Sequence, residues 1–132
     1  MASSLTRILP VHERPMPEPR AELLKGTLDL LILRALTVGP QHGYGVARWL
    51  ESSSHELLRI EEGSLYPALY RMEGRGWIRS EWGLSENNRR AKFYSLTTEG
   101  RSRLRDEAFG WERLVEAVTL ILSTQPVEAR QG

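Results

Sequence analysis

The chain of 132 residues contains no cysteine. This absence excludes disulfide bonds, thiolate nucleophiles and the zinc or iron–sulfur centres that depend on cysteine. Histidine is also scarce, and the three that occur, His12, His42 and His55, do not share a spacing that would place two of them on one helix face. We therefore expect neither a metal site nor a cofactor.

Long apolar runs are missing as well. No stretch approaches the roughly 18 apolar residues that a membrane span requires. The first residues also lack the apolar segment of a secretory signal peptide. We expect a cytoplasmic protein that makes no contact with a membrane.

The chain has little excess of charge of either sign, because 18 basic residues stand against 17 acidic ones and the formal net charge is +1. A polycation that coats nucleic acid is therefore excluded. A nucleic-acid partner would require positive charge that is concentrated at one place on the surface.

The residues of a catalytic centre are lacking too. No serine motif has an obvious histidine partner. The acidic pairs Glu61-Glu62 and Asp106-Glu107 are adjacent in the chain, so the two side chains of each pair do not share a helix face. We expect that the protein is not an enzyme.

What is present is the composition of one ordinary globular domain, with 40% hydrophobic and 27% charged residues. Four of the seven prolines lie before residue 20, and their fixed φ and missing N–H disfavour a helix. Residues 1–22 are therefore predicted to form a flexible tail.

Three helices are predicted next from the spacing of apolar residues and from the residues that interrupt it. The first covers 27–37, the second covers 42–52, and the third covers 63–74 with Pro67 in its first turn. Residues 57–60 are consistent with a very short strand.

A hairpin and a long helix complete the predicted fold. Two runs rich in aromatic and hydroxyl residues, 77–82 and 92–96, are joined by the polar segment 83–91. Thr97 then caps a helix that runs to about Leu122. This order predicts a mainly α fold with a small β-hairpin (α+β), which is a winged helix-turn-helix domain with an appended C-terminal helix.

The last helix carries an apolar seam that predicts a dimer. Its spacing of four and three residues is typical of a coiled coil, and its members are Leu104, Ala108, Trp111, Val115, Val118 and Leu122. A second copy is the economical partner for this seam, and packing on the chain's own first helix is the alternative. Trp111 is also a candidate wall of a pocket for a flat, apolar effector.

The chain accordingly divides into a DNA-binding unit (23–97), a dimerisation helix (98–123) and a frayed end (124–132).

The third helix separates into two faces. Leu65, Leu69 and Met72 lie on one face and are predicted to join the core. The other face carries Ser64, Tyr66, Pro67, Tyr70 and Arg71. We interpret it as a recognition helix for the DNA major groove, in which Arg71 donates to guanine O6 and N7. A merely solvated face is the alternative.

The hairpin supplies the local positive charge that the whole chain lacks. From Arg75 to Lys92, five basic residues stand against two acidic ones. The predicted contacts with phosphates or with the minor groove come from Asn88, Arg89, Arg90 and Lys92. The alternative is that the hairpin is only a solubilising loop. The interpretation as a DNA contact therefore depends on the cationic hairpin, which we call the wing, occurring together with the recognition helix.

Three further residues are weaker candidates for contacts with the DNA backbone. Thr27 is expected to cap the first helix, where Lys25 and free N–H groups would hold a phosphate. Tyr44, at the start of the second helix, is placed in the same way.

These motifs together closely resemble the PadR family of bacterial transcriptional regulators, which have a winged-helix fold. The resemblance covers about residues 23–105. It is carried by five ordered segments, Lys25-Gly26-Thr27-Leu28-Asp29-Leu30-Leu31-Ile32-Leu33, His42-Gly43-Tyr44-Gly45-Val46, Gly63-Ser64-Leu65-Tyr66-Pro67-Ala68-Leu69, Gly74-Arg75-Gly76-Trp77-Ile78 and Arg89-Arg90-Ala91-Lys92-Phe93-Tyr94-Ser95-Leu96-Thr97 followed by Glu99-Gly100-Arg101.

The resemblance implies a homodimeric repressor, without enzymatic activity, that binds an operator in double-stranded DNA. It implies that the helix with Tyr66 and Pro67 enters the major groove, that the wing contacts the backbone or minor groove, and that the C-terminal helices form the dimer. In several members a small aromatic effector binds near that interface and releases DNA. The proline-rich tail departs from the family core, and the single C-terminal helix is similar to the short subgroup. From the residues alone, a winged-helix module that binds another protein and not DNA is the alternative.

Overall fold

The structure, a computed structural model, describes residues 21–125, and describes side chains from residue 26 onward. The predicted tail up to residue 20 and the end of the chain from residue 126 lie outside the described residues.

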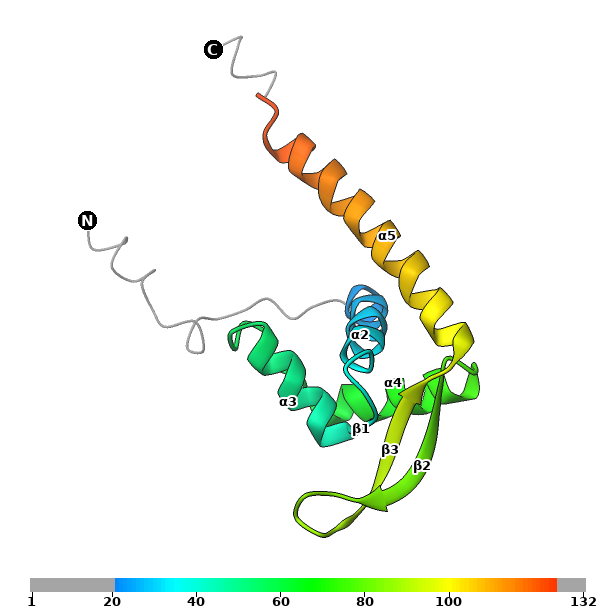
Figure 1. Ribbon diagram of the computed structural model, residues 1–132. Helices are drawn as coiled ribbons and strands as arrows, with labels where there is room; N and C mark the ends of the chain where they lie inside the picture. The colour runs from blue at the N-terminus through cyan, green and yellow to red at the C-terminus, as the bar shows by residue number, and fades with distance from the viewer. Residues whose placement is uncertain (1–20, 126–132) are drawn as a thin grey trace, which may run out of the picture.

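The elements follow the predicted order, with one short strand added (Figure 1). They are α2 (Ala21–Ala35), β1 (Gln41–His42), α3 (Gly43–Ser53), α4 (Glu62–Gly74), β2 (Ile78–Leu84), β3 (Arg90–Leu96) and α5 (Thr98–Leu122). The mainly α fold with a β-hairpin and a long last helix is confirmed.

Helix α2 begins earlier than the sequence pattern predicted. It starts at Ala21 and so includes residues that were assigned to the tail, and Thr27 lies inside it. The prediction that Thr27 caps this helix is therefore wrong, because good helix formers such as Leu23 and Leu24 extend the helix toward the N-terminus. At the other end the Gln41 side-chain amide donates to the Ala35 carbonyl over 3.0 Å, which satisfies one carbonyl of the last turn.

The sheet has three antiparallel strands in the order β1-β3-β2. Strands β2 and β3 pair from Ile78↔Leu96 to Leu84↔Arg90, and His42 of β1 pairs with Phe93. The predicted strand at 57–60 is wrong, because these residues belong to the loop between α3 and α4. Gln41 and His42 occupy the edge of β3, a pairing that β propensity alone does not reveal.

The core lies between helices α2, α3 and α4 and the base of the hairpin. Its fully buried side chains come from every one of these elements and are Ile32, Leu33, Val46, Leu65, Leu69, Met72 and Ile78. The predicted inner face of α4 is thereby confirmed. Among the described residues the core holds no polar or charged side chain, so apolar burial dominates its stability.

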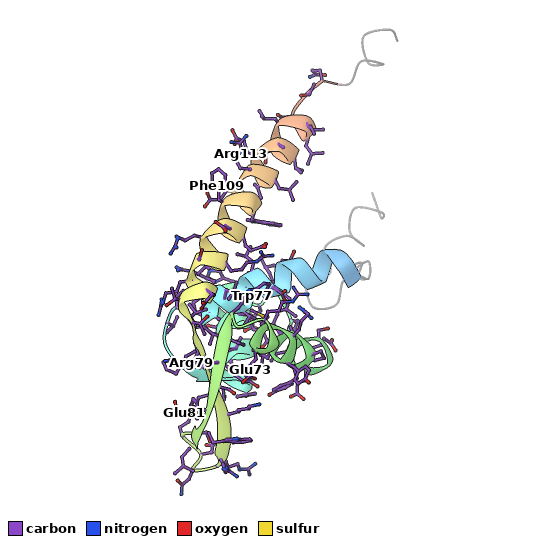
Figure 2. All side chains as sticks on the ribbon, turned by 90° about the vertical axis from the view of Figure 1, so that its right-hand side faces the viewer. Glu73, Trp77, Arg79, Glu81, Phe109 and Arg113 are labelled. Atoms are coloured by element: carbon purple, nitrogen blue, oxygen red, sulfur yellow. The ribbon has the colours of Figure 1, made fainter. Side chains whose placement is uncertain are left out.

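Helix α5 is anchored at its first turn and then leaves the domain. The Thr97 hydroxyl accepts the Gly100 N–H over 3.0 Å, which confirms the predicted cap. A Cβ at Gly100 would lie 2.0 Å from the Trp77 carbonyl oxygen, so only glycine permits this close approach. Figures 1 and 2 show the far end of α5 and the hairpin at opposite ends of the molecule. Within residues 21–125, no helix has the length and apolarity needed to cross a membrane.

Candidate nucleic-acid interface

Helix α4 presents the predicted polar and aromatic face. The tyrosine side chains of Tyr66 and Tyr70 are 43% and 81% exposed, respectively. Pro67 is exposed and Ser64 is half-buried. These four residues therefore lie where an outside partner can contact them.

Pro67 lies deeper in the helix than predicted. Helix α4 begins at Glu62, so Pro67 follows its first turn and is not part of it. The proline ring removes the N–H that would otherwise bond the Gly63 carbonyl. Gly63 is exposed, so solvent can take that place, and the helix gains a rigid apolar point on its outer face.

The Tyr66 ring lies directly against the start of α3. A Cβ added at Gly43 would lie 2.6 Å from Tyr66 Cε1 and 2.8 Å from its hydroxyl oxygen, so the ring fills the space that a side chain at Gly43 would need. Burial, followed by the Glu62 carboxylate, raises the pKa of the Tyr66 hydroxyl. The hydroxyl therefore stays protonated at neutral pH and is available as a hydrogen-bond donor.

Arg71 does not lie with the other recognition residues. Its guanidinium Nη2 donates to Asp29 Oδ1 on α2 over 2.5 Å. It lines a hollow with Arg75, Trp77 and Arg103 on the side of α4 that faces α2 and α5. The prediction that Arg71 reads a base is therefore corrected: it joins α4 to α2.

The tip of the wing is a tight turn formed by backbone hydrogen bonds. The Asn88 N–H donates to the Ser85 carbonyl and the Ser85 N–H donates to the Arg89 carbonyl, both over 2.8 Å. Asn88 adopts a φ of 62°, a left-handed conformation that asparagine tolerates. Arg89 and Arg90 are exposed on either side of the point where β3 begins. The predicted cationic tip is thus confirmed as an exposed feature.

An acidic residue of α4, Glu73, moderates the charge of the wing. Lys92 Nζ lies 3.7 Å from Glu73 Oε1 on α4, and the other Glu73 oxygen accepts the Ser80 hydroxyl over 2.6 Å. Figure 2 shows Glu73 beside the hairpin, away from its tip. Lys92 consequently tethers the wing to α4 as well as adding charge.

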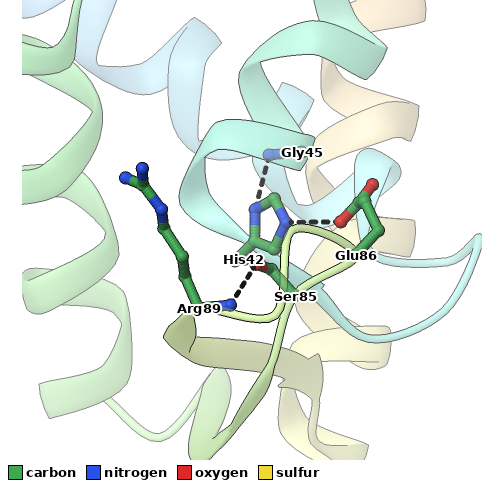
Figure 3. Close-up of polar contacts among 5 residues, drawn as sticks. All are labelled: His42, Gly45, Ser85, Glu86 and Arg89. Atoms are coloured by element: carbon green, nitrogen blue, oxygen red, sulfur yellow. Dashed lines mark hydrogen bonds and ion pairs between the residues drawn. The ribbon is translucent and has the colours of Figure 1, made fainter.

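His42 joins the wing to α3, a role that no pattern in the sequence indicated. Its Nδ1 accepts the Gly45 N–H over 2.9 Å and so caps α3, while its Nε2 lies 3.4 Å from Glu86 Oε1 at the wing tip (Figure 3). Because Nδ1 accepts a hydrogen bond, the proton of the neutral ring belongs on Nε2, which donates to Glu86. The ring also meets Phe93 edge-on at 5.3 Å.

A groove of about 490 Å³ lies between the wing, the first turn of α3 and Tyr66 of α4. Aromatic side chains form much of its wall, from Tyr44, Tyr66, Trp82 and Tyr94. The cations that line it are Arg89, Arg90 and Lys92, and among its described lining residues Glu86 is the acidic one. The fold thereby brings the predicted wing together with Tyr66 of α4, whereas Ser64, Pro67 and Tyr70 are not among the residues that line the groove.

The three weaker candidates for contacts with the DNA backbone lie in different surroundings. Tyr44 is 61% exposed in the first turn of α3, and the Arg48 guanidinium lies 6.0 Å from its ring centroid. Thr27 and the backbone of Lys25 lie within α2, so the expected free N–H groups of a helix start are not at these positions. The side chain of Lys25 lies outside the described residues. Across the described part of the chain, no group of three acidic or histidine side chains is arranged to hold a metal.

The predicted seam of α5 is largely uncovered in the single chain. Leu104 packs against the core, but Trp111, Val115 and Val118 are each more than 40% exposed, and Leu122 is 79% exposed. Figure 2 shows Phe109 and Arg113 on the part of α5 that stands clear of the domain. Packing of α5 on α2 therefore accounts only for the first part of the helix.

The sequence matches the transcriptional regulator PadR-like family over residues 32–106. The chain belongs to the PadR-like family. This PadR-like chain is similar to a solved PadR family transcriptional regulator from Eggerthella lenta, with 34% identity, 79% of this chain and 88% of the other covered, and a TM-score of 0.67. It is also similar to a transcriptional regulator from Clostridium thermocellum, with 30% identity, 79% and 100% coverage, and a TM-score of 0.68.

A further relative of this PadR-like chain is a protein from Lysinibacillus sphaericus that is named only as uncharacterized protein X. It is 24% identical over 103 residues, which are 78% of this chain and 94% of the relative. The PadR-like family comprises transcriptional regulators and not enzymes, which confirms the expectation that this chain is not an enzyme.

Proposed function

We propose that this transcriptional regulator is a homodimeric repressor that binds an inverted-repeat operator in double-stranded DNA. The observation that supports this best is the groove in which Tyr66 of α4 and the cationic wing meet. A protein that binds a specific sequence of duplex DNA needs both features, because phosphate contacts position the protein and groove contacts specify the sequence. Ser64, Tyr66, Pro67 and Tyr70 would enter the major groove, and Asn88, Arg89, Arg90 and Lys92 would contact the backbone.

The exposed seam of α5 supports the dimer. Apolar side chains continue around the helix beyond the seam itself, since Leu114 is 50% and Ile121 70% exposed. A two-fold axis would let the same seam of two copies cover itself. Two recognition helices should then lie roughly 34 Å apart, one turn of DNA, which predicts an inverted repeat.

We further propose that a small aromatic compound binds near the dimer interface and releases the DNA. Trp111 lines an open hollow of about 430 Å³ between α2 and α5, together with Leu30 and Leu114. A second copy of α5 would close this hollow, and its aromatic and aliphatic lining suits a flat, apolar molecule. We likewise propose that the chain divides at residue 97 into a DNA-binding unit and a dimerisation helix. We also propose that the protein is cytoplasmic.

The test is selection of bound duplexes from random DNA, followed by affinity titration at rising salt. We expect an inverted repeat and a steep loss of affinity with salt. Arg90→Ala should reduce the salt slope by about one unit. Arg79→Ala is the matched control, because Arg79 is exposed and lies on the opposite face of β2 from Trp82 and the groove. Absence of any selected sequence, with weak and salt-insensitive binding, would instead favour a protein-binding winged helix.

A further inference from the structure

One face of the hairpin continues beyond the core as an apolar surface. Alternate residues of β2 lie on the same side of the sheet, so Ile78, Ser80, Trp82 and Leu84 share a face. Ile78 is 1% exposed in the core, whereas Trp82 is 56% and Leu84 is 66% exposed. Two large apolar side chains beside a cationic tip indicate a contact surface and not a solubilising loop.

Cations bracket these two apolar side chains. Lys92 is the cross-strand partner of Trp82, and Arg90 is the partner of Leu84. The Arg90 guanidinium lies 4.5 Å from the centroid of the Trp82 ring. A guanidinium above an aromatic face keeps its N–H donors in its own plane, where they can still bind an anion. The ring therefore orients Arg90 without neutralising its charge.

The wall of the groove that faces the wing is also aromatic, and this restricts the kind of ligand that can bind in the groove. Tyr44 and Tyr66 come from the helices and face the wing across the groove. A strand of duplex DNA presents the matching chemistry, because its phosphates are anionic and its deoxyribose rings have an apolar face. Lysine or arginine alone would serve a phosphate, but an indole wall suits the sugar that lies between two phosphates.

We propose that Trp82 and Arg90 act as one DNA-contacting unit, in which the indole holds the guanidinium toward a phosphate and itself packs against deoxyribose. This inference rests on the proposed function. Trp82 thereby contributes part of the affinity for DNA through an apolar contact. This part does not depend on how many phosphates the protein's cations neutralise. Pre-ordering of Arg90 also reduces the side-chain entropy that is lost when DNA binds.

The experiment measures affinity for the selected operator at several salt concentrations. We expect Trp82→Ala to weaken binding by about 5- to 20-fold with an unchanged salt slope, because no charge is removed. Trp82→Phe, which retains an aromatic face, should recover most of that loss. In the Arg90→Ala background Trp82→Ala should have a smaller effect, because the two side chains act together.

Glu81→Gln is the matched control, since Glu81 precedes Trp82 on the opposite face of β2 and does not line the groove. Thermal unfolding should be the same for parent and Trp82→Ala, which separates a lost contact from a lost fold. Binding of Trp82→Ala at parental affinity, or fully additive losses in the double variant, would overturn the inference and leave the proposed function intact. A parent chain that binds no duplex would overturn both.

Discussion

The Arg71 guanidinium pairs with the Asp29 carboxylate, and this contact joins helix α4 to α2 across 42 residues of sequence. Both side chains are largely shielded, with exposed fractions of 26% and 14%. The most obvious base-reading cation of α4 is thus part of the support of the helix. Under the proposed function, sequence preference would then come from Ser64, Tyr66 and Tyr70, which lie on its outer face.

Removing Arg71 should change the ionisation of Asp29. Burial raises the pKa of Asp29, and the positive charge of Arg71 and its hydrogen bond oppose that rise. Arg71→Met should therefore raise the pKa of Asp29 further, which NMR titration of the carboxyl carbon would measure. Arg105→Met, an exposed substitution on α5, is the control and should leave this pKa unchanged. An unchanged Asp29 pKa in Arg71→Met would contradict the ion pair.

The same variant should lose stability in a pH-dependent way. Because the folded-state pKa of Asp29 is raised above 3.8, its contribution is greatest below that value and is lost as the pH rises through the folded-state pKa. Without Arg71 the ionised carboxylate loses its hydrogen-bonded cation, so the loss should be about 1–3 kcal/mol at neutral pH. It should shrink in acid, where Asp29 is protonated. Urea unfolding at several pH values measures this, and a loss that is equal at all pH values would be unexpected.

A side chain at Gly43 should disturb the recognition helix through Tyr66. The Cβ of Gly43→Ala would clash with the Tyr66 ring at 2.6 Å. We expect a stability loss of about 1–3 kcal/mol and weaker operator binding. Gly74→Ala is the control, because a Cβ at Gly74 meets nothing within 4 Å. Equal stability and affinity of the two variants would show that the Tyr66 ring moves aside without consequence.

Neutralising Glu86 should strengthen DNA binding. The hydrogen bond from its own backbone, followed by the His42 side chain, lowers the pKa of Glu86, so its carboxylate is charged at neutral pH beside the cations of the groove. Glu86→Gln keeps an oxygen for His42 and removes the repulsion of phosphate. Affinity should rise about two- to fivefold at low salt and less at high salt. Glu81→Gln, on the other face of β2, should have a smaller effect, and an affinity gain equal in both variants would indicate only a general charge effect.

A charge in the seam of α5 should dissociate the proposed dimer. Val118→Glu would bury two carboxylates at a two-fold interface, so the dimer should weaken by roughly 100-fold or more. Leu120→Glu is the matched control: Leu120 is also an exposed apolar residue of α5, but it lies on the face opposite the seam. Analytical ultracentrifugation distinguishes the two, and a parent that sediments as a monomer would refute the dimer.

The hairpin shows why some features could be read from the sequence and others could not. Alternation and turn residues predicted the strands and the exposed arginines, because these depend on neighbours in the chain. The contact of Trp82 with Arg90 depends on the register of β2 and β3, which places Trp82 opposite Lys92. A shift of one residue would move Trp82 to the other face.

The order of the helices and the hairpin, the inner face of α4, the cap at Thr97 and the seam of α5 were determined by the sequence alone, because periodicity and capping act within a few residues. Only the tertiary structure decided that Arg71 turns to Asp29, that Gln41 and His42 form an edge strand, and that His42 reaches Glu86 over 44 residues. Each of these contacts joins residues that are distant in the chain. Their partners are set by the packing of whole elements, which local patterns do not encode.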